Sequence, residues 1–472
     1  MNKTRRNFLK RSAALSLGIL AQQFLTTSRS YADAVKKAFI WKNWSGNVSF
    51  TPKQVFYPET VEQVKQAILT STKVRVTGAG HSFSALVPSV NLISPQKFKQ
   101  IHIDSSRMEV TTGAGVTLSE LNNALVAAGF ALPTAGEIDH QTMAGLIATA
   151  TKGTGVQFGS FSDAEQLLGL SIVDGRGEFH NIDFSDAKYK NVEPALRINL
   201  GAFGFVTAVK FKIVPSFTLK EVHSKASLTD AIQPENYTQN YRYSFYYYPH
   251  SHQTIKRTQN ITTESYSDLA LEKRNKKKAL MEDTLGNLLI TVLSHAPSLL
   301  PKASKIFFAQ QPDSETAVGR WDKIMINNRK MRYLEMQYVL PVEKLLQAMT
   351  LIKAKTDELS KQGTYFVDIP VNVRFSRGDK STLLSPAQDA SKVYAQIDLN
   401  CHLKQKNSEL FMKAVEKDLV ALGAKPHWGK ISYVAVGSLH EGIVEFENFR
   451  RQWDPENRFQ NDFIKKNISD LV

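Results

Sequence analysis

Short stretches in which apolar and polar residues alternate fill the chain between about residues 50 and 215, and glycine turns separate them. This spacing predicts strands at 74–77, 108–112, 168–173 and 205–214. Two helices are predicted to begin at capping boxes, one formed by Thr60 with Gln63 and one by Thr117 with Glu120. The order of short strands and helices predicts an α+β fold.

The pattern changes after residue 215. Residues 217–425 combine aromatic-rich strands such as 241–248 with longer helical segments, which predicts a separate substrate-covering (cap) domain. The remaining segment, 426–472, is expected to form a strand at 431–436 and a helix at 445–451. We expect this segment to return to the first domain, formed by residues 48–216.

The spacing of five apolar residues predicts that they lie on one side of a helix. They are Met281, Leu285, Leu288, Leu289 and Val292. Pro297 and Pro301 are expected to end this pattern. A basic cluster at 273–278 directly precedes it. The plain interpretation is a solvated basic face and an apolar stripe that packs on the protein's own cap domain. The alternative is peripheral contact with a membrane surface.

Residues 1–34 resemble a twin-arginine export signal. Arg5 and Arg6 precede an apolar run at 13–25 and a small-residue cleavage site at 32–34. The run is shorter than the roughly 20 residues of a membrane-spanning helix, and an uncleaved anchor is the alternative. Twin-arginine export machinery carries folded proteins, which suits a protein that loads a large cofactor before it reaches the periplasm or another exported location.

The net charge of the chain limits the kinds of binding partner to be expected. The chain of 472 residues has a net charge of +15, and removal of the signal takes away six basic residues and one acidic residue. The mature protein stays basic, but a periplasmic location excludes nucleic acid as its expected partner. Cys401 is the only cysteine, so no intrachain disulfide and no two-cysteine metal or redox site is expected. No metal site is predicted.

Candidate chemistry begins where the predicted strand 74–77 ends, in the segment Gly78-Ala79-Gly80-His81-Ser82. Glycines let the backbone approach a phosphate group closely, although many strands simply turn at such a triplet. A Rossmann-type site needs a third glycine where Phe83 stands and then a helix, and neither is present. A second segment of small and hydroxylated residues, 142–155, suits close contact with a flat ring and a pyrophosphate.

These segments belong to a longer set: 44–46, 57–58, 78–84, 135–155, 201–204, 426–430 and 454–461. Together they resemble flavoproteins related to vanillyl-alcohol oxidase and p-cresol methylhydroxylase, in the aldonolactone and alditol oxidase branch. The resemblance implies a two-domain fold with an FAD-binding domain of the p-cresol methylhydroxylase (PCMH) type and a cap domain. It implies that FAD is the cofactor.

The resemblance also implies roles for residues. His81 matches the histidine that bonds covalently to the 8α carbon of the flavin, and the alternative is an imidazole that only satisfies a turn. A second bond through Cys401 is not expected. Lys152 stands where the branch commonly has histidine. The residues expected to bind FAD are Gly78, Ala79, Gly80, His81, Ser82, Thr142, Gly145, Thr149, Thr151, Gly153, Thr154, Gly155, Phe205 and Val206.

For catalysis, Lys430 matches the active-site lysine of the branch and Arg374 its substrate-facing arginine. The plain alternatives are a surface lysine and an arginine paired to a neighbouring acid. Asn372 replaces a glutamate of sugar-alcohol oxidases, and an amide cannot act as a base. Asp398 also differs from the residue that polyol oxidases of the branch have at this position. We therefore do not infer a polyol substrate for this chain from the resemblance. One hypothesis is that Asp398 has become the base.

The sequence thus predicts an enzyme that transfers a hydride from the CH–OH group of a small hydroxylated substrate to FAD. Sugar lactones, alditols and related alcohols are the candidate substrates, and dioxygen or another acceptor reoxidises the flavin. One alternative is a non-catalytic binding or assembly protein that keeps the FAD fold. Another is a basic membrane-surface protein in which the flavin-like motifs are coincidental.

Overall fold

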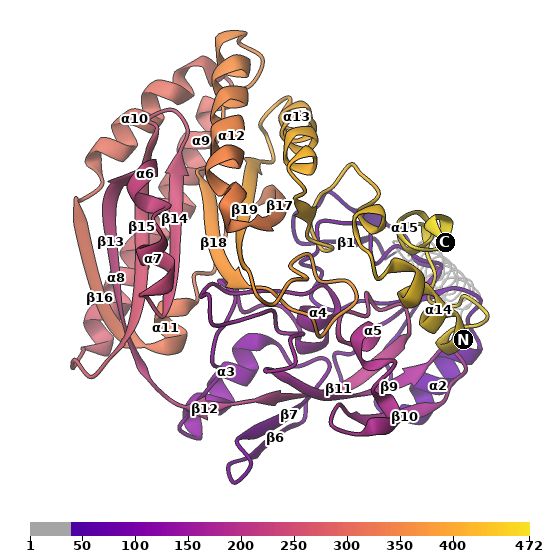
Figure 1. Cartoon of the computed structure of the whole chain (residues 1–472). Coiled ribbons are helices and arrows are strands. Elements are labelled where there is room, and N and C mark those ends of the chain that lie inside the picture. The colour runs from indigo at the N-terminus through magenta and orange to yellow at the C-terminus, as the bar shows by residue number, and fades with distance from the viewer. Residues whose placement is uncertain (1–38) are drawn as a thin grey trace, which may run out of the picture. The chain divides into compact units, whose positions relative to one another are not determined.

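The computed structural model describes residues 39–472, and the predicted export signal lies outside the described residues. Within residues 42–472 the chain is a mixture of helices and sheets (Figure 1). No helix in the described part of the chain has the length and apolar character needed to cross a membrane. β1 (Trp41–Lys42) and β2 (Ser49–Phe50) are the first strands described.

The two larger sheets before residue 216 have three and five strands. A parallel sheet has the order β3-β5-β4, and an antiparallel sheet has the order β10-β9-β11-β7-β6. Each of the four strands expected from the sequence is present, as β4, β7, β9 and β11. The strands are β3 (Gln54–Phe56), β4 (Val74–Val76), β5 (Asn91–Ile93), β6 (Ile101–Asp104), β7 (Glu109–Gly113), β9 (Leu167–Asp174), β10 (Phe179–Asp183) and β11 (Gly204–Lys212).

The helices of this part are short. They are α2 (Val61–Leu69), α3 (Leu118–Ala127), α4 (Met143–Ala148), η1 (Ala187–Tyr189) and α5 (Glu193–Arg197), and β8 (Phe130–Ala131) pairs with β12 (Val214–Pro215). The capping box of α3 is complete, because Thr117 and Glu120 each accept a backbone N–H from the other. At α2 the prediction is half right: Thr60 accepts from Gln63, but Gln63 accepts from Glu59 N–H.

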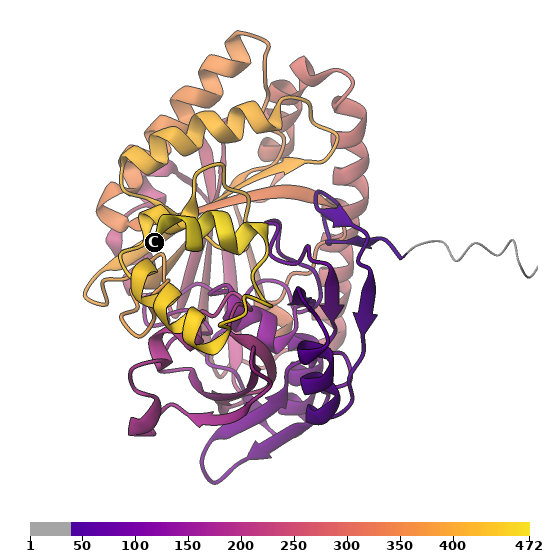
Figure 2. The same ribbon diagram turned by 90° about the vertical axis from the view of Figure 1, so that its right-hand side faces the viewer.

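An eight-stranded antiparallel sheet dominates the rest, in the order β16-β13-β15-β14-β18-β19-β17-β20. Helices α12 and α13 lie beside each other against it (Figures 1 and 2). The strands are β13 (Thr218–Ser227), β14 (Arg242–Tyr248), β15 (Gln253–Thr262), β16 (Ser314–Arg320), β17 (Tyr333–Pro341), β18 (Val371–Arg377), β19 (Val393–His402) and β20 (Lys425–Pro426). The helices are α6 (Leu228–Ala231), α7 (Pro234–Thr238), α11 (Trp321–Met325), η4 (Val342–Lys344), α12 (Leu345–Lys361) and α13 (Ser408–Ala421).

Four central strands of this sheet have one apolar face and one polar face, because successive side chains of a strand point to opposite sides. Val371, Val373 and Phe375 of β18 pack into the core under α12 and α13. The intervening Asn372 and Arg374 line a cavity on the other side. The same alternation holds in β14, β17 and β19, so the sheet supplies a core and a polar cavity wall at once.

The C-terminal segment packs with the first part of the chain. Helices η5 (Val436–Leu439), α14 (Ile443–Trp453), α15 (Asp462–Asn467) and η6 (Ser469–Leu471) follow β20, and α14 contacts α5. The expected strand at 431–436 is wrong. Side chains take the place of a strand partner there, since Tyr433 N–H donates to Glu416 and Val436 N–H to Asn467. The domain boundaries stay a prediction.

The apolar stripe lies in a helical segment between β15 and β16. This segment comprises α8 (Asp268–Ala279), the π-helical η2 (Leu280–Gly286), α9 (Asn287–Leu293), η3 (Pro297–Leu299) and α10 (Leu300–Gln310). Pro301 does not end a helix but stands in the first turn of α10, where proline is tolerated. The interpretation that the stripe packs on the cap domain is wrong, because all five side chains are exposed.

Candidate active site

A cavity of about 290 Å³ lies between the loops 81–82 and 136–152 and the polar face of the eight-stranded sheet. The structure brings eight of the predicted site residues together in its lining. They are His81, Ser82, Thr149, Thr151, Asn372, Arg374, Asp398 and Lys430. The proposed cofactor anchor and all four proposed catalytic residues therefore face one space.

His81 is held between two rings at the edge of the cavity. Trp44 stacks on its imidazole with ring centroids 5.5 Å apart, and His140 stacks on it at 6.1 Å. The preceding Gly80 has a φ of +70°, a conformation that side-chain-bearing residues rarely adopt. Burial, with help from His140 and Lys430, lowers the pKa of His81 to about 4. At neutral pH the imidazole is therefore uncharged and keeps a free lone pair.

The loop that carries His81 is fastened to the segment that carries Lys430. Phe83 N–H donates to Gly429 O at 2.7 Å, and the Ser84 hydroxyl donates to Trp428 O at 2.8 Å. The ammonium of Lys430 lies 4.8 Å from the centre of the Phe83 ring. Residues almost 350 positions apart thus form one rigid corner of the site.

Lys430 forms a buried ion pair with Glu335 of β17. Burial raises the pKa of Glu335, and the neighbouring Lys430 opposes that rise. The sequence analysis did not single out Glu335. Its signal was the polar alternation Tyr333, Glu335, Gln337 within an otherwise apolar strand, and all three side chains line the cavity.

Asp398 of β19 organises a second polar cluster. Arg374 donates to both carboxylate oxygens, at 3.1 Å from Nε and 3.2 Å from Nη2. Asn372 donates to Asp398 at 3.1 Å, and Gln337 donates at 2.5 Å. The carboxylate that pairs with Arg374 thus comes from the neighbouring strand and not from position 372. Arg374 is paired and also faces the cavity.

Lys152 is a buried residue of the cavity lining. Among residues 39–472 its ammonium has neither a salt-bridge partner nor a hydrogen-bond partner. Burial lowers the pKa of Lys152 to about 8, although Asp379 and Asp163 partly oppose this. A buried ammonium without a hydrogen-bond partner is costly, so Lys152 is expected to lower the stability of the protein.

Other residues of the cavity lining also have buried polar atoms without a hydrogen-bond partner in the described chain. Buried amide atoms without a hydrogen-bond partner in the described chain occur at Gln141, Asn327, Asn372 and Asn400, all of which line the cavity. Buried polar groups in folded proteins are nearly always paired. Together with the charged side chains of the lining, these amide residues suit a ligand with many hydrogen-bond donors and acceptors, such as the polar edge of a flavin ring and a hydroxylated substrate.

The other predicted FAD contacts lie outside this cavity lining. Gly78 and Ala79 are exposed, and a side chain at Gly78 would meet the Thr142 hydroxyl at 2.4 Å. A side chain at Gly145 would meet the same hydroxyl at 2.9 Å. The two glycine-rich segments therefore touch at Thr142, as two walls of one binding region would.

Five further residues of the set contribute to packing. The Thr154 hydroxyl bonds the backbone of β14 and β18, and Gly155 N–H donates to Phe375 O at 2.7 Å. Gly153 lies close to the Ala135 carbonyl. Phe205 and Val206 are buried in hydrophobic clusters. These residues join the loop 142–155 and β11 to the sheets behind the cavity.

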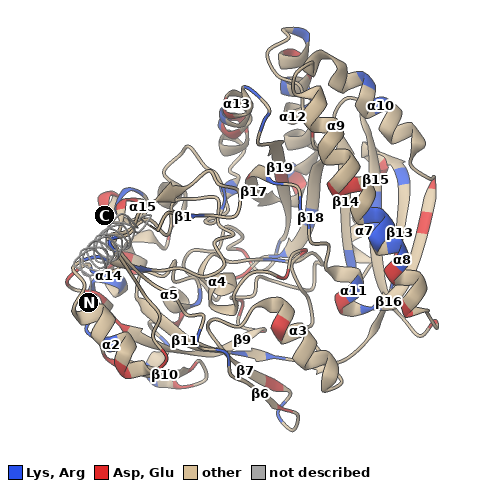
Figure 3. Ribbon diagram, turned by 180° about the vertical axis from the view of Figure 1, so that it is seen from behind, with Lys and Arg blue, Asp and Glu red and all other residues tan. Residues whose placement is uncertain are grey.

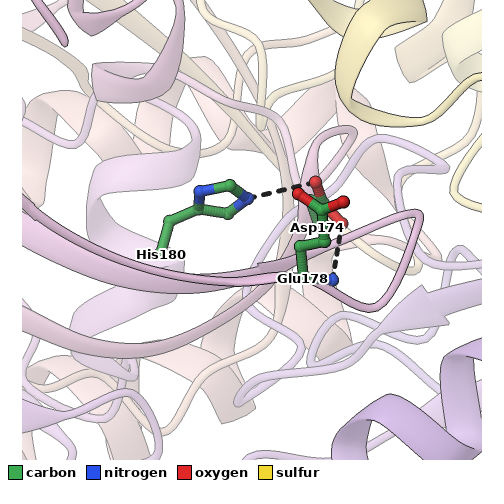
Figure 4. A group of neighbouring side chains, drawn as sticks. All are labelled: Asp174, Glu178 and His180. Carbon is green, nitrogen blue, oxygen red and sulfur yellow. Dashed lines mark hydrogen bonds and ion pairs between the residues drawn. The ribbon is translucent and has the colours of Figure 1, made fainter. Parts of the chain in front are cut away.

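A separate cluster of possible metal ligands lies at the turn between β9 and β10. Asp174 accepts from Glu178 N–H at 2.9 Å and lies 3.1 Å from His180 Nε2 (Figure 4). Arg176 already pairs with both carboxylates, at 2.8 Å and 3.2 Å. Hydrogen bonds and an internal cation thus explain the cluster as a stabilised turn.

Comparison with known proteins identifies the class. Residues 52–183 match an FAD-binding domain family, and residues 209–467, more than half of the chain, match the D-arabinono-1,4-lactone oxidase family. The cholesterol oxidase of B. sterolicum has the same fold, with a TM-score of 0.70 and 13% identity over 91% of this chain and 96% of that one.

Three sequence relatives can be named. An L-gulono-1,4-lactone dehydrogenase of Mycobacterium tuberculosis is 27% identical over 90% of this chain and 98% of its own length. An L-gulonolactone oxidase of Scyliorhinus torazame is 25% identical over 90% and 97%. A D-arabinono-1,4-lactone oxidase of Saccharomyces cerevisiae is 26% identical over 76% and 70%.

The protein is an FAD-dependent oxidoreductase with a PCMH-type FAD-binding domain and a second, cap domain. The alternative of a non-catalytic FAD-fold protein finds no support in these relatives. The chain belongs to the D-arabinono-1,4-lactone oxidase family.

Proposed function

We propose that the enzyme oxidises a CH–OH carbon of a sugar-derived lactone or a closely related hydroxylated compound. The observation that carries this proposal is the single cavity in which His81 meets Lys430, Arg374 and Lys152. Amide residues complete a lining that suits a polyhydroxylated molecule. The relatives named as lactone oxidases and a lactone dehydrogenase support the same substrate class.

FAD, when bound, supplies the hydride acceptor, and His81 is the proposed covalent anchor. The neutral imidazole is the nucleophilic form, and the rings of Trp44 and His140 fix its orientation. The adjoining segments 78–82 and 142–145, together with Thr149 and Thr151, would hold the cofactor's polar groups.

The chain's own residues orient the substrate and move its proton. Arg374, locked by Asp398, is a fixed donor for a carbonyl or hydroxyl oxygen. Glu335 is the proposed base, because burial raises its pKa and, among residues 39–472, Lys430 alone forms an ion pair with its carboxylate. Both oxygens of Asp398 already accept hydrogen bonds, so a positioning role suits Asp398 better than the role of base.

The test of the anchor is acid precipitation of the purified protein. We expect yellow colour to stay in the pellet of the wild-type protein and to move to the supernatant for His81→Ala. His102→Ala, at an exposed histidine of β6 that does not line the cavity, is the matched control and keeps the colour in the pellet. A wild-type pellet without colour would contradict the covalent anchor but not FAD binding.

The substrate and the acceptor are tested on the same preparation. Anaerobic addition of L-gulono-1,4-lactone or D-arabinono-1,4-lactone is expected to bleach the flavin absorbance. Admission of dioxygen then distinguishes an oxidase, which regains its colour and forms hydrogen peroxide, from a dehydrogenase, which needs another acceptor. Absence of bleaching by every lactone and alditol tried would refute the substrate class.

We also propose export through the twin-arginine route to the periplasm. The support is the Arg5-Arg6 pair before the apolar run at 13–25. Replacement of both arginines by lysine keeps the charge but is expected to leave the protein in the cytoplasm, as fractionation of cells would show. Equal periplasmic amounts of both forms would contradict this proposal.

A further inference from the structure

An exposed apolar face lies on the helices between β15 and β16. Residues 266–306 contain 10 of the 23 large hydrophobic residues that are exposed among residues 39–472, although they make up less than a tenth of the chain. We call the following set the apolar face: Leu280, Met281, Leu285, Leu288, Leu289, Val292, Leu299 and Ile306. Each of these side chains is 45% to 59% exposed. Such clustering marks an interaction site.

Lysines flank the apolar face on both sides. Lys273 and Lys277 are exposed on α8, and Lys302 and Lys305 are exposed on α10. None of the four forms a salt bridge with any residue in the described part of the chain. Helix α9 between them carries no charged residue (Figure 3). An apolar strip with free cations at its edges is the pattern of a helix that lies in a membrane interface.

The apolar face adjoins the active-site cavity. Met281 and Leu289 belong to the face and also line the cavity, and Ile290, Leu293 and Phe307 continue the apolar lining inward. The same cavity reaches His81 and Lys430. The route to the active site therefore begins among the residues that are exposed and apolar.

The four lysines favour one binding partner for the apolar face over the others. A second copy of the chain would bring the same four unpaired lysines against one another, which costs Coulomb energy. Nucleic acid would not cover eight apolar side chains. An anionic lipid bilayer satisfies both parts, because phosphate headgroups pair with lysines while the acyl boundary receives the apolar side chains.

We propose that the apolar face and its four flanking lysines dock the protein on an anionic lipid bilayer, with the mouth of the active-site cavity directed at the membrane. The helices lie in the headgroup region and do not span it. This inference does not depend on which substrate the enzyme oxidises.

The test is co-sedimentation of the purified holoenzyme with vesicles. Binding is expected to vesicles that contain phosphatidylglycerol and to weaken in high salt, with little binding to pure phosphatidylcholine. Leu288→Asp/Val292→Asp, at two positions outside the cavity lining, is expected to weaken binding at least about tenfold. The matched control Leu346→Asp/Leu410→Asp, at exposed leucines of α12 and α13, is expected to bind normally.

A labelling experiment locates the contact. Because Cys401 is buried, a cysteine introduced at Leu288 can be labelled selectively with an environment-sensitive dye. We expect its emission to shift to the blue on anionic vesicles, while a dye at Ala187→Cys in the FAD-binding part does not shift. Wild-type binding by Leu288→Asp/Val292→Asp, no binding to anionic vesicles, or a shift at 187 alone would overturn the proposal.

Discussion

Arg374 of β18 and Asp398 of β19 form a two-pronged ion pair in the wall of the active-site cavity, with their closest N–O distance at 2.9 Å. Both residues are more than 90% buried. The pair exists because Asn372 and Asp398 are direct partners in the β18–β19 register, so the next cavity-facing residue of β18 reaches the same carboxylate.

Removal of Asp398 is expected to leave Arg374 as a buried, unpaired cation. Asp398→Ala should therefore destabilise the protein by about 3–5 kcal/mol, and Asp398→Asn by less, because the amide keeps one acceptor. Thermal unfolding of both variants measures this. If Asp398→Asn abolishes flavin reduction while the fold stays intact, Asp398 is the base and our assignment to Glu335 is wrong.

Glu335 and Lys430 are expected to matter for the reaction more than for the fold. Glu335→Gln keeps the shape of the side chain but removes the proton acceptor, and we expect flavin reduction to slow by about 10²–10⁴-fold. Because burial raises the pKa of Glu335, the wild-type rate should increase as pH rises through that pKa. This increase should be missing in Glu335→Gln, and stopped-flow reduction at several pH values measures both effects.

Lys152 is predicted to lower stability while it supports activity. Its pKa falls from 10.5 to about 8 on folding, so the folded state resists a proton that the unfolded chain binds. Stability from this group is therefore lost as pH falls from about 10.5 to 8, by up to about 3 kcal/mol. Lys152→Met should be more stable than wild type at pH 7 and equal to it near pH 10.5, with slower flavin reduction at pH 7.

Thermal unfolding of the two proteins at both pH values checks the sign. Lys188→Met, at an exposed lysine, is the control and should change neither stability nor rate. Equal stability of wild type and Lys152→Met at pH 7 would contradict the prediction that the buried ammonium lowers stability.

Two glycines of the loop 136–153 are predicted to respond differently to alanine. A side chain at Gly153 would lie 2.5 Å from the Ala135 carbonyl oxygen, so Gly153→Ala should destabilise the protein by about 1–3 kcal/mol. At Gly136 the nearest atom is 3.6 Å away, so Gly136→Ala should fold normally. Gly136 lines the cavity, so the added methyl group is nevertheless expected to weaken the binding of flavin or substrate. Titration of the Gly136→Ala variant would measure this loss of affinity.

Local patterns in the sequence predicted local structure well. Alternation found β4, β7, β9 and β11, and the Thr117 capping box is complete because its partners are three residues apart. The motif resemblance singled out His81, Arg374 and Lys430, and the structure places all three in the lining of one cavity. These successes depend on neighbours in the chain or on a whole motif set.

Pairings between distant segments escaped the sequence analysis. The partner of Lys430 is Glu335, 95 positions away, and only the fold of the segment after β20 against β17 brings them together. The acid of Arg374 was unassigned for the same reason, since strand register is not visible in one strand alone. Helical spacing found the stripe at 281–292 but not its surroundings, and the structure leaves it exposed.

The two-faced strands of the large sheet separate what the enzyme recognises from what keeps it folded. Substitutions at Asn372, Asp398 or Asn400 can reshape the cavity while their sequence neighbours Val371, Ile397 and Leu399 continue to hold the helices behind. Selection can thus explore new substrates one alternate position at a time, which is one physical route by which relatives with one architecture diverge in chemistry.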